Sequence, residues 1–252
     1  MIPLSIVMPA YNEAENIEPG VLEWYEAVVS RVSGAEMIVV DDCSRDDTGG
    51  RLRSLAARLP ALRVLATPVN GGHGPALRFG LEHASGEFVF HTDSDRQHTP
   101  DDFWALWERR AGMDFVFGVR DHRADGAFRA VISSMMRVLN VLLWGHWIDD
   151  ANCPYKLMRR TALEQVLPSI SRSSFIPMVM VAVLARRAGF RVSEVQVRHF
   201  PRVAGQQSLK GVLRWAGISR RCVTDLVMLR LDEACGRRHQ PASLSGNQPG
   251  RP

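Results

Sequence analysis

The chain has 252 residues, of which 46% are apolar and 23% charged, as in ordinary globular proteins. This length allows one large α/β domain or two small ones and excludes a longer array. The net charge of +4 is mild but uneven, because residues 196–252 hold ten Lys and Arg against three Asp and Glu. Such a basic end indicates an anionic partner or a membrane surface, although basic tails often serve solubility alone.

The four cysteines form no Cys-x-x-Cys pair; they are Cys43, Cys153, Cys222 and Cys235. Their scatter predicts reduced thiols in a cytoplasmic protein. No signal peptide is expected, since the N-terminus runs directly into a strand-like segment. No apolar run approaches the roughly 20 residues that span a bilayer, so we expect no transmembrane helix.

In the first half of the chain, short apolar runs alternate with helix-like stretches. The expected strands are Ser5–Met8, Met37–Val40, Arg63–Leu65, Phe88–Phe90 and Phe115–Gly118. The expected helices are Ala14–Val32, Thr48–Leu59, Pro75–Ala84 and Pro100–Arg110. Continuous apolar strands in β-α-β order predict an α/β fold with a mostly parallel sheet covered by helices on both faces.

The second half has a different pattern, with long amphipathic and basic stretches. The expected helices are Ala127–Trp144, which is amphipathic, Pro177–Ala188, and the basic stretch Leu209–Leu231. Two further strands are expected at Tyr155–Met158 and Arg191–Val197. From Gly236 onward, the abundance of Pro, Gly, Ser and Gln predicts a disordered tail.

Polar residues cluster just after three of the expected strands. The clusters are Pro9 to Glu13, Asp41-Asp42 and Asp93-Ser94-Asp95. In open parallel sheets, ligands bind outside the carboxyl ends of the strands. We therefore expect all three clusters to line one site at one edge of the sheet.

The pair Asp93 and Asp95 has the spacing of a metal site. In extended backbone, residues two apart point the same way, so both carboxylates can hold one Mg²⁺ or Mn²⁺ that keeps positions open for phosphate. Gln97 or His98 could add a ligand. The alternative is a plain turn or helix cap, since Thr99-Pro100-Asp101 resembles a helix start.

Other motifs leave alternatives open. Asp42 can bond a nucleotide's ribose or base, or it can belong to an Asp-rich turn before a helix. The segment from Asn70 to Pro75 is glycine-rich but matches neither the P-loop nor the dinucleotide fingerprint. Three histidines, His73, His91 and His98, fit no standard zinc spacing. Cys153 has no evident activating partner as a nucleophile.

Four segments in this order resemble the family 2 glycosyltransferases of GT-A fold: IVMPAYNEAENI, VVDDCSRDDT, NGGHGPALRFGLEHASGEFVFHTDSDRQHTPDDF and FGVRDHR. The resemblance covers roughly residues 4–215. The stretch DSDRQH is similar to the motif of the dolichyl- or polyprenyl-phosphate sugar synthase branch, where Ala is commoner than Ser94. The resemblance implies a metal-dependent, inverting transfer of a sugar from a GDP- or UDP-sugar to a polyprenyl-phosphate lipid.

The resemblance also implies roles for individual residues. The donor would contact Pro9, Tyr11, Glu13, Asp42, Asp93 and Ser94, and the metal, Mg²⁺ or Mn²⁺, would bind Asp93, Asp95 and Gln97. Phosphate and acceptor would contact Arg120, Arg129, Lys156, Arg202 and Ser208. Arg120 and Arg202 could instead form surface salt bridges. Asp95 and Arg120 are expected to take part in catalysis, and Asp150 is the candidate base if the acceptor is a hydroxyl.

The implied organisation is a single domain over residues 1–235, with a donor half at 1–120 and an acceptor half at 121–235. The apolar face of residues 131–147 could meet the inner face of a membrane or simply be core. A hydroxyl-acceptor enzyme, a nucleotidyltransferase and a non-catalytic nucleotide-binding module remain as alternatives. Nucleic acid is not an expected partner, because basic and aromatic residues do not interleave.

Overall fold

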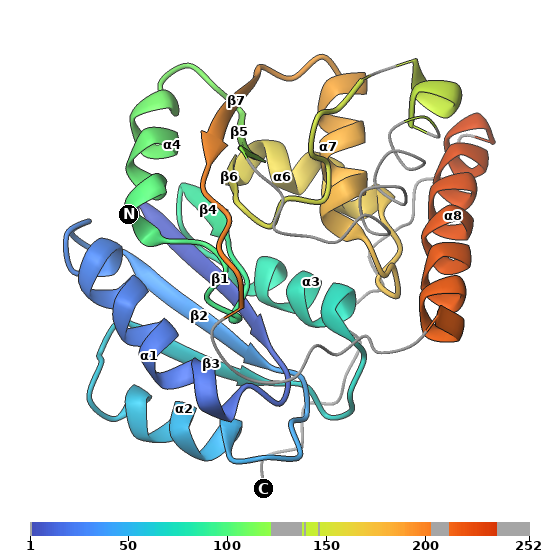
Figure 1. The fold of residues 1–252 in the computed structure, drawn as a ribbon. Helices are drawn as coiled ribbons and strands as arrows, with labels where there is room; N and C mark the ends of the chain where they lie inside the picture. Colours follow the sequence, from blue (N-terminus) through green and yellow to red (C-terminus); the bar gives the residue numbers. More distant parts are fainter. Residues whose placement is uncertain (1, 122–137, 139, 146, 203–211, 236–252) are drawn as a thin grey trace, which may run out of the picture.

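The computed structural model describes residues 2–121, 138, 140–145, 147–202 and 212–235 (Figure 1). The predicted tail, most of the predicted helix at 127–144 with Arg129, and Ser208 lie outside the described residues. The proposed division into donor and acceptor halves stays a prediction.

A seven-stranded sheet forms the centre of the molecule in the order β3-β2-β1-β4-β6-β5-β7. Its strands are β1 Leu4–Ala10, β2 Glu36–Asp41, β3 Leu62–Ala66, β4 Phe88–His91, β5 Phe115–Arg120, β6 Lys156–Arg159 and β7 Val192–Val197. Strand β6 runs antiparallel to β4 and β5, and the other pairs are parallel. The predicted α/β fold with a mostly parallel sheet is confirmed, and each predicted strand is present.

Helices cover both faces of the sheet (Figure 1). They are α1 Ala14–Trp24, continued by the π-helical turn η1 Tyr25–Val29, α2 Thr48–Ala56, α3 His73–His83, the 3₁₀ turn η2 Pro100–Asp102, α4 Phe103–Arg109, α6 Arg160–Val166, the 3₁₀ turn η3 Leu167–Ser169, α7 Pro177–Arg187 and α8 Val212–Ala234. Helix α6 was not expected from the sequence. It is a short helix, for which the periodic signal is weak.

The two faces of the sheet carry separate apolar cores. Alternate residues of β1, such as Leu4 and Ile6, pack with α1, α2 and α4. Val7 points to the other face, where the core includes residues of α3, α6, α7 and α8. This follows from the period of two along a strand, and it explains why the buried strands are mostly apolar on both sides.

Helix α3 packs unusually close to the sheet, because Gly80 faces β1 and β2. A Cβ atom there would lie 2.5 Å from Val7 Cγ1 and 2.9 Å from Val40 Cγ2. Glycine at this position therefore lets the helix approach the strands. The close packing fixes the N-terminal end of α3 beside the carboxyl ends of β1 and β2.

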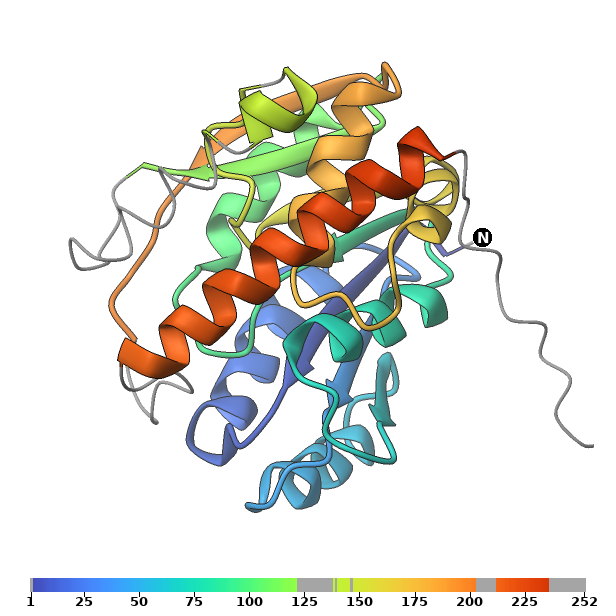
Figure 2. The same ribbon diagram turned by 90° about the vertical axis from the view of Figure 1, so that its right-hand side faces the viewer.

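Helix α8 crosses the outer side of the molecule (Figure 2). Leu226 and Leu229 of this helix are buried in the second core. None of the helices in the described part of the chain combines the length and the apolar character needed to cross a bilayer.

Candidate active site

A cavity of about 660 Å³ opens where β1, β2 and β4 end at the carboxyl edge of the sheet. All three strand-end clusters contribute to its lining: Pro9, Tyr11, Glu13, Asp42, Asp93, Ser94 and Asp95. The lining also includes Phe175, Ile176 and Met178 around the start of α7, with Arg202 and Arg221. The structure thus brings together side chains that lie far apart in the sequence, as the strand order requires.

Asp42 holds the glycine-rich loop that precedes α3. Its Oδ1 accepts hydrogen bonds from the Thr67 hydroxyl at 2.8 Å and the Gly71 amide at 3.0 Å, and its Oδ2 accepts from the Gly72 amide at 2.7 Å. Gly72 has a φ of +89°, which favours glycine. Neighbouring Asp41 accepts from the Ser44 amide at 3.0 Å and so supports the loop after β2.

Glu13 and Arg202, which both line the cavity, form a close ion pair. Arg202 Nη2 lies 2.5 Å from Glu13 Oε1 and 2.6 Å from Oε2, and both side chains are largely buried. Asn16 donates a further hydrogen bond to Glu13 Oε2 at 2.8 Å. The pair joins the segment after β1 to the segment after β7. Arg202 therefore has a salt-bridge partner and also lines the cavity.

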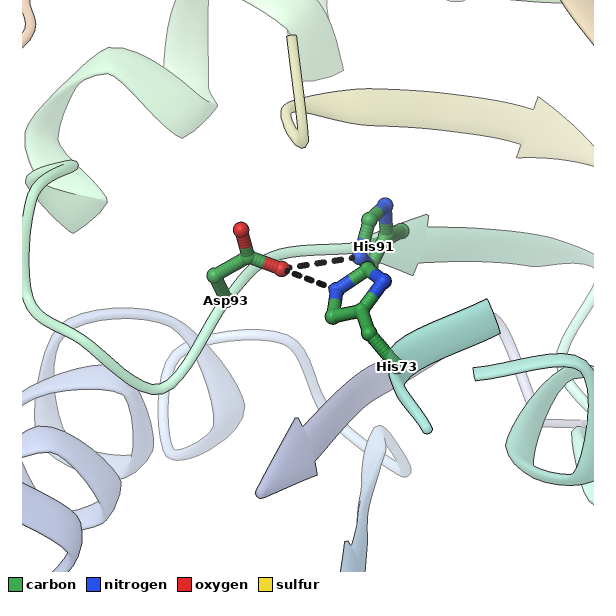
Figure 3. Close-up of side chains that lie close together, drawn as sticks. All are labelled: His73, His91 and Asp93. Carbon is green, nitrogen blue, oxygen red and sulfur yellow. Dashed lines mark hydrogen bonds and ion pairs between the residues drawn. The ribbon is translucent and has the colours of Figure 1, made fainter. Parts of the chain in front are cut away.

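Asp93 lies against two imidazole rings (Figure 3). Its Oδ1 is 2.9 Å from Nε2 of His73 and 3.3 Å from Nε2 of His91. His91 ends β4 and is 1% exposed; its Nε2 contacts Asp93, and its Nδ1 has no hydrogen-bond partner among the described residues. Burial alone would raise the pKa of Asp93, but the charge and hydrogen bond of His73 hold that pKa well below its usual range.

Asp95 shares the cavity with Asp93 but has a different electrostatic environment. Burial and the neighbouring charge of Asp93 raise the pKa of the Asp95 carboxyl to about 7. Two carboxylates in one concave site, one of which raises the pKa of the other, fit a divalent cation, which would relieve their repulsion.

Two residues suggested as additional metal ligands lie outside the cavity lining. Gln97 donates its side-chain amide to the Phe200 carbonyl at 3.1 Å, and its backbone amide donates to Asp95 Oδ1 at 3.2 Å. His98 Nδ1 lies 3.0 Å from the Arg198 carbonyl. Both side chains therefore contact the segment after β7, and the role of Gln97 as a ligand stays a prediction.

Arg120 and Asp150, two of the predicted catalytic residues, bind each other. Arg120 Nε and Nη2 donate to the Asp150 carboxylate at 2.6 and 2.7 Å, and the two side chains are 7% and 8% exposed. Neither residue lines the cavity. The salt-bridge alternative for Arg120 thus describes its main contact, although the pair is buried. The roles of both residues in the reaction stay predictions.

Lys156 is completely buried at the start of β6, where its Nζ donates to the Cys153 carbonyl. Burial lowers its pKa. The cavity lining does not include it, so contact with phosphate stays a prediction.

Sequence reasoning missed several residues that line the cavity. His73 and His91 were considered only as part of a zinc spacing, and nothing in the sequence shows that α3 brings His73 to the end of β4. The apolar wall at the start of α7 and Arg221 of α8 carried no motif. The basic character of α8 was the one signal available for Arg221.

The sheet order and the carboxyl-edge cavity define an α/β protein of the GT-A class, and solved structures confirm this fold. Glucosyl-3-phosphoglycerate synthase from Mycobacterium tuberculosis, in complex with Mn²⁺, UDP-glucose and phosphoglyceric acid, superimposes with a TM-score of 0.69 at 22% identity, over 90% of this chain and 79% of that one. The same enzyme with Mg²⁺ and UDP gives 0.68 over 96% and 81%. At this identity, the likeness concerns the fold alone.

The chain belongs to glycosyl transferase family 2, whose family model matches residues 5–167. Among its relatives is undecaprenyl-phosphate 4-deoxy-4-formamido-L-arabinose transferase of Pseudomonas paraeruginosa, 32% identical over 81% of this chain and 59% of the relative. The enzyme of that name from Yersinia enterocolitica is 32% identical over 80% and 61%. The predicted resemblance to the polyprenyl-phosphate branch is confirmed, while the chain spans about three fifths of these relatives' length.

Proposed function

We propose that this chain is a metal-dependent glycosyltransferase that moves a sugar from a nucleotide-sugar to a polyprenyl-phosphate lipid. The observation that carries the proposal is the cavity at the carboxyl edge, where the carboxylates that follow β1, β2 and β4 converge. Relatives named as undecaprenyl-phosphate transferases support the acceptor class. The sugar donor is a UDP-sugar or a GDP-sugar.

The donor end of the cavity has the polar and apolar surfaces that a nucleoside needs. Tyr11 and Pro9 offer flat apolar area, and the loop held by Asp42 presents backbone close to the cavity. In the proposed complex, Asp42 and Glu13 accept hydrogen bonds from the nucleoside. Because Arg202 occupies both oxygens of Glu13, donor binding would compete with or rearrange that ion pair.

In the proposed enzyme, Asp93 and Asp95 hold a divalent cation, Mg²⁺ or Mn²⁺. Such an ion supplies Lewis-acid stabilisation to a departing diphosphate. The protein contributes two carboxylates after a buried strand, in the lining of the cavity. Fixed charges of this kind stabilise developing charge without reorganisation.

The acceptor end of the cavity suits an anion next to an apolar chain. Arg202 and Arg221 bring positive charge, and Phe175, Ile176 and Met178 bring apolar surface. A lipid phosphate is already anionic at neutral pH and needs no strong base. This agrees with the position of Asp150, which is paired with Arg120 away from the cavity lining. A hydroxyl acceptor, in contrast, requires a carboxylate within hydrogen-bond reach of its proton.

Two exposed apolar groups support contact with the inner surface of a membrane by a cytoplasmic protein. One is in the segment of the predicted amphipathic face, Val138, Val141, Leu142 and Trp147; the other is on α8, Val227, Met228 and Leu231. Trp144 of the first segment and Leu226 and Leu229 of α8 belong to the same buried core. Trp144 of the same segment is buried, so part of the predicted face is core.

Vesicle binding tests the membrane contact. Leu142→Gln, at a site 76% exposed, should weaken sedimentation with vesicles that contain anionic lipid, whereas Val69→Gln, at a site 69% exposed elsewhere, should not. Equal binding by both variants would contradict this surface.

Nucleoside-diphosphate release tests the proposed activity. A panel of UDP- and GDP-sugars is incubated with Mn²⁺ or Mg²⁺, with and without polyprenyl phosphate. Release should require the lipid and should disappear in Asp95→Asn. Release with a hydroxyl acceptor and none with lipid would favour the hydroxyl-acceptor alternative, and no release with any donor would refute the proposed function.

A further inference from the structure

We propose that Arg221 of α8 binds the phosphate of the lipid acceptor, and that Asp225, one turn further along the helix, is a positioning residue that holds Arg221 at the cavity. These roles rest on the proposed function, because they concern the acceptor of that reaction. Neither residue was among those that the sequence predicted for the site.

Arg221 brings positive charge to the cavity lining. Arg202, the other arginine of the described lining, is bound to both oxygens of Glu13, whereas no described carboxylate forms an ion pair with Arg221. The guanidinium of Arg221 stands over the ring of Phe175, with its Cζ 5.9 Å from the ring centroid. A ring face attracts a cation, and the planar N–H donors of the guanidinium are then available to bind phosphate oxygens.

Asp225 fastens α8 to the segment that precedes α7. Its Oδ2 accepts hydrogen bonds from the Phe175 amide at 2.7 Å and from the Ser174 hydroxyl at 3.0 Å. Asp225 follows Arg221 by four positions, and residues four apart lie on the same side of a helix. One carboxylate therefore fixes the backbone of Phe175 to the helical turn that carries Arg221.

The segment that Asp225 holds is also fixed by α3. Arg78, which is 7% exposed, donates from Nη1 to the Ile170 carbonyl. Gly74 packs so closely on this segment that a Cβ atom there would overlap the Ser174 carbonyl oxygen. The cavity wall around Arg221 is thus tied to two helices before a ligand binds, and a group held in advance loses less freedom on binding.

The surroundings of Arg221 favour the acceptor over the nucleotide donor. Met228 follows Arg221 by seven positions, so the two residues lie on the same face of α8, about 10 Å apart along its axis. Met228 is 51% exposed, and Leu231 beyond it is 52% exposed. A cation followed by exposed apolar side chains matches a phosphate that carries a long apolar chain. A nucleotide-sugar has no such chain.

Isothermal titration calorimetry with geranyl phosphate, a soluble short-chain prenyl phosphate, tests the site without donor or metal. The wild type is compared with Arg221→Gln, and the matched control is Arg220→Gln, since Arg220 is exposed on the same helix but is not part of the described cavity lining. Two variants test the positioning role: Asp225→Ala removes the acceptor of both hydrogen bonds, whereas Asp225→Asn keeps a carbonyl oxygen there. Circular dichroism of each variant verifies folding.

Arg221→Gln should weaken geranyl phosphate binding at least about tenfold, because a hydrogen bond to a charged group contributes roughly that factor. Arg220→Gln should bind as the wild type does. Asp225→Ala should weaken binding about threefold to tenfold, since one long side chain must then be ordered on binding. Asp225→Asn should restore most of the affinity. Adding Asp225→Ala to Arg221→Gln should cause little further loss, because Asp225 acts through Arg221.

Two kinds of result would overturn the proposal. Undetectable binding by the wild type, or unchanged binding by Arg221→Gln, would refute the phosphate-binding role of Arg221. Because Arg221 is exposed, its replacement should leave folding intact, and this result stands even if Asp225→Ala does not fold. Binding by Asp225→Asn as weak as that of Arg221→Gln, or a full additional loss in the double variant, would refute the positioning role of Asp225.

Parallel turnover assays separate this proposal from the proposed function. Arg221→Gln should raise the KM for polyprenyl phosphate with little change in kcat, and it should leave the KM for the nucleotide-sugar unchanged. A higher KM for the nucleotide-sugar alone would assign Arg221 to the donor and overturn the proposal. If geranyl phosphate binds through Arg221 but no donor is turned over, the phosphate site stands and the proposed transferase activity fails. If turnover occurs and Arg221→Gln changes neither binding nor the acceptor KM, the transferase activity stands and the role of Arg221 fails.

Discussion

The pair of Arg120 and Asp150 provides a sharp test of how the acceptor side is built. Asp150→Asn leaves the shape of the side chain nearly unchanged but removes the charge that faces Arg120 at 2.6 and 2.7 Å. Because the two side chains are 7% and 8% exposed, the guanidinium would stay buried beside a neutral amide. Breaking a buried pair in this way costs about 3–5 kcal/mol. Because the amide can still accept one hydrogen bond, we expect the free energy of unfolding to fall by about 3 kcal/mol.

For a chain of this size, a loss of about 3 kcal/mol lowers the melting temperature by roughly 6–12 °C. Urea unfolding gives the free energy, and a cycle with Arg120→Met and the double variant should show a large coupling energy. Arg58→Met is the control, since its pair with Glu18 is 59% and 40% exposed and should contribute at most about 1 kcal/mol. If Asp150→Asn unfolds as the wild type does yet loses turnover, the pair is not structural and Asp150 acts on substrate.

Three further variants or measurements test other parts of the account. Gly80→Ala should destabilise the protein by about 1–3 kcal/mol in urea unfolding, because its Cβ would meet β1 and β2. The control Gly217→Ala lies in open space on α8 and should not destabilise the protein. Equal effects of the two variants would contradict the close packing of α3. Burial alone would raise the pKa of Glu36, but hydrogen bonds from Ser and Arg side chains outweigh burial and lower that pKa below 4.5. The stability that the ionised Glu36 contributes is therefore present above pH 4.5 and is lost as the pH falls through the pKa of the folded state. In urea unfolding measured from about pH 6 to 3, Glu36→Gln should lose less stability with acid than the wild type, and an equal loss would refute this. Burial raises the pKa of the Cys153 thiol to about 11. Alkylation of the native protein at pH 8, read by mass spectrometry, should therefore label exposed Cys43 and spare Cys153. Comparable labelling of the two cysteines would contradict the burial of Cys153.

The N-terminal part of the fold, from β1 to β4, could be predicted well because its signals are local. Strands β1, β2 and β4 are mostly apolar and are followed by polar residues, so a rule about sheet edges sufficed to place Asp42 and Asp93 in one cavity. The reversed direction of β6 was not predictable in this way. An apolar segment such as Tyr155–Met158 has the same pattern whichever way it runs, and its direction is decided by pairing with β4 and β5.

The site contacts that the sequence did not reveal are long-range contacts between side chains. His73 meets Asp93 because α3 packs on β1 and β2 through Gly80, a geometry that no spacing of histidines shows. Arg202 reaches Glu13 across 189 positions of the chain. Asp150 was matched to a family motif, but its contact with Arg120 depends on how the segment before β6 packs against β5.

The proposed enzyme transfers a sugar to a lipid phosphate in the cavity at the carboxyl edge of the sheet. The most direct measurement follows a radiolabelled sugar from its nucleotide donor, with metal and polyprenyl phosphate, into the organic phase. We expect label in the organic phase in step with nucleoside-diphosphate release, and neither in Asp95→Asn. Label that stays in the aqueous phase while the diphosphate is released would contradict the lipid acceptor, and an active Asp95→Asn would contradict the assignment of the site.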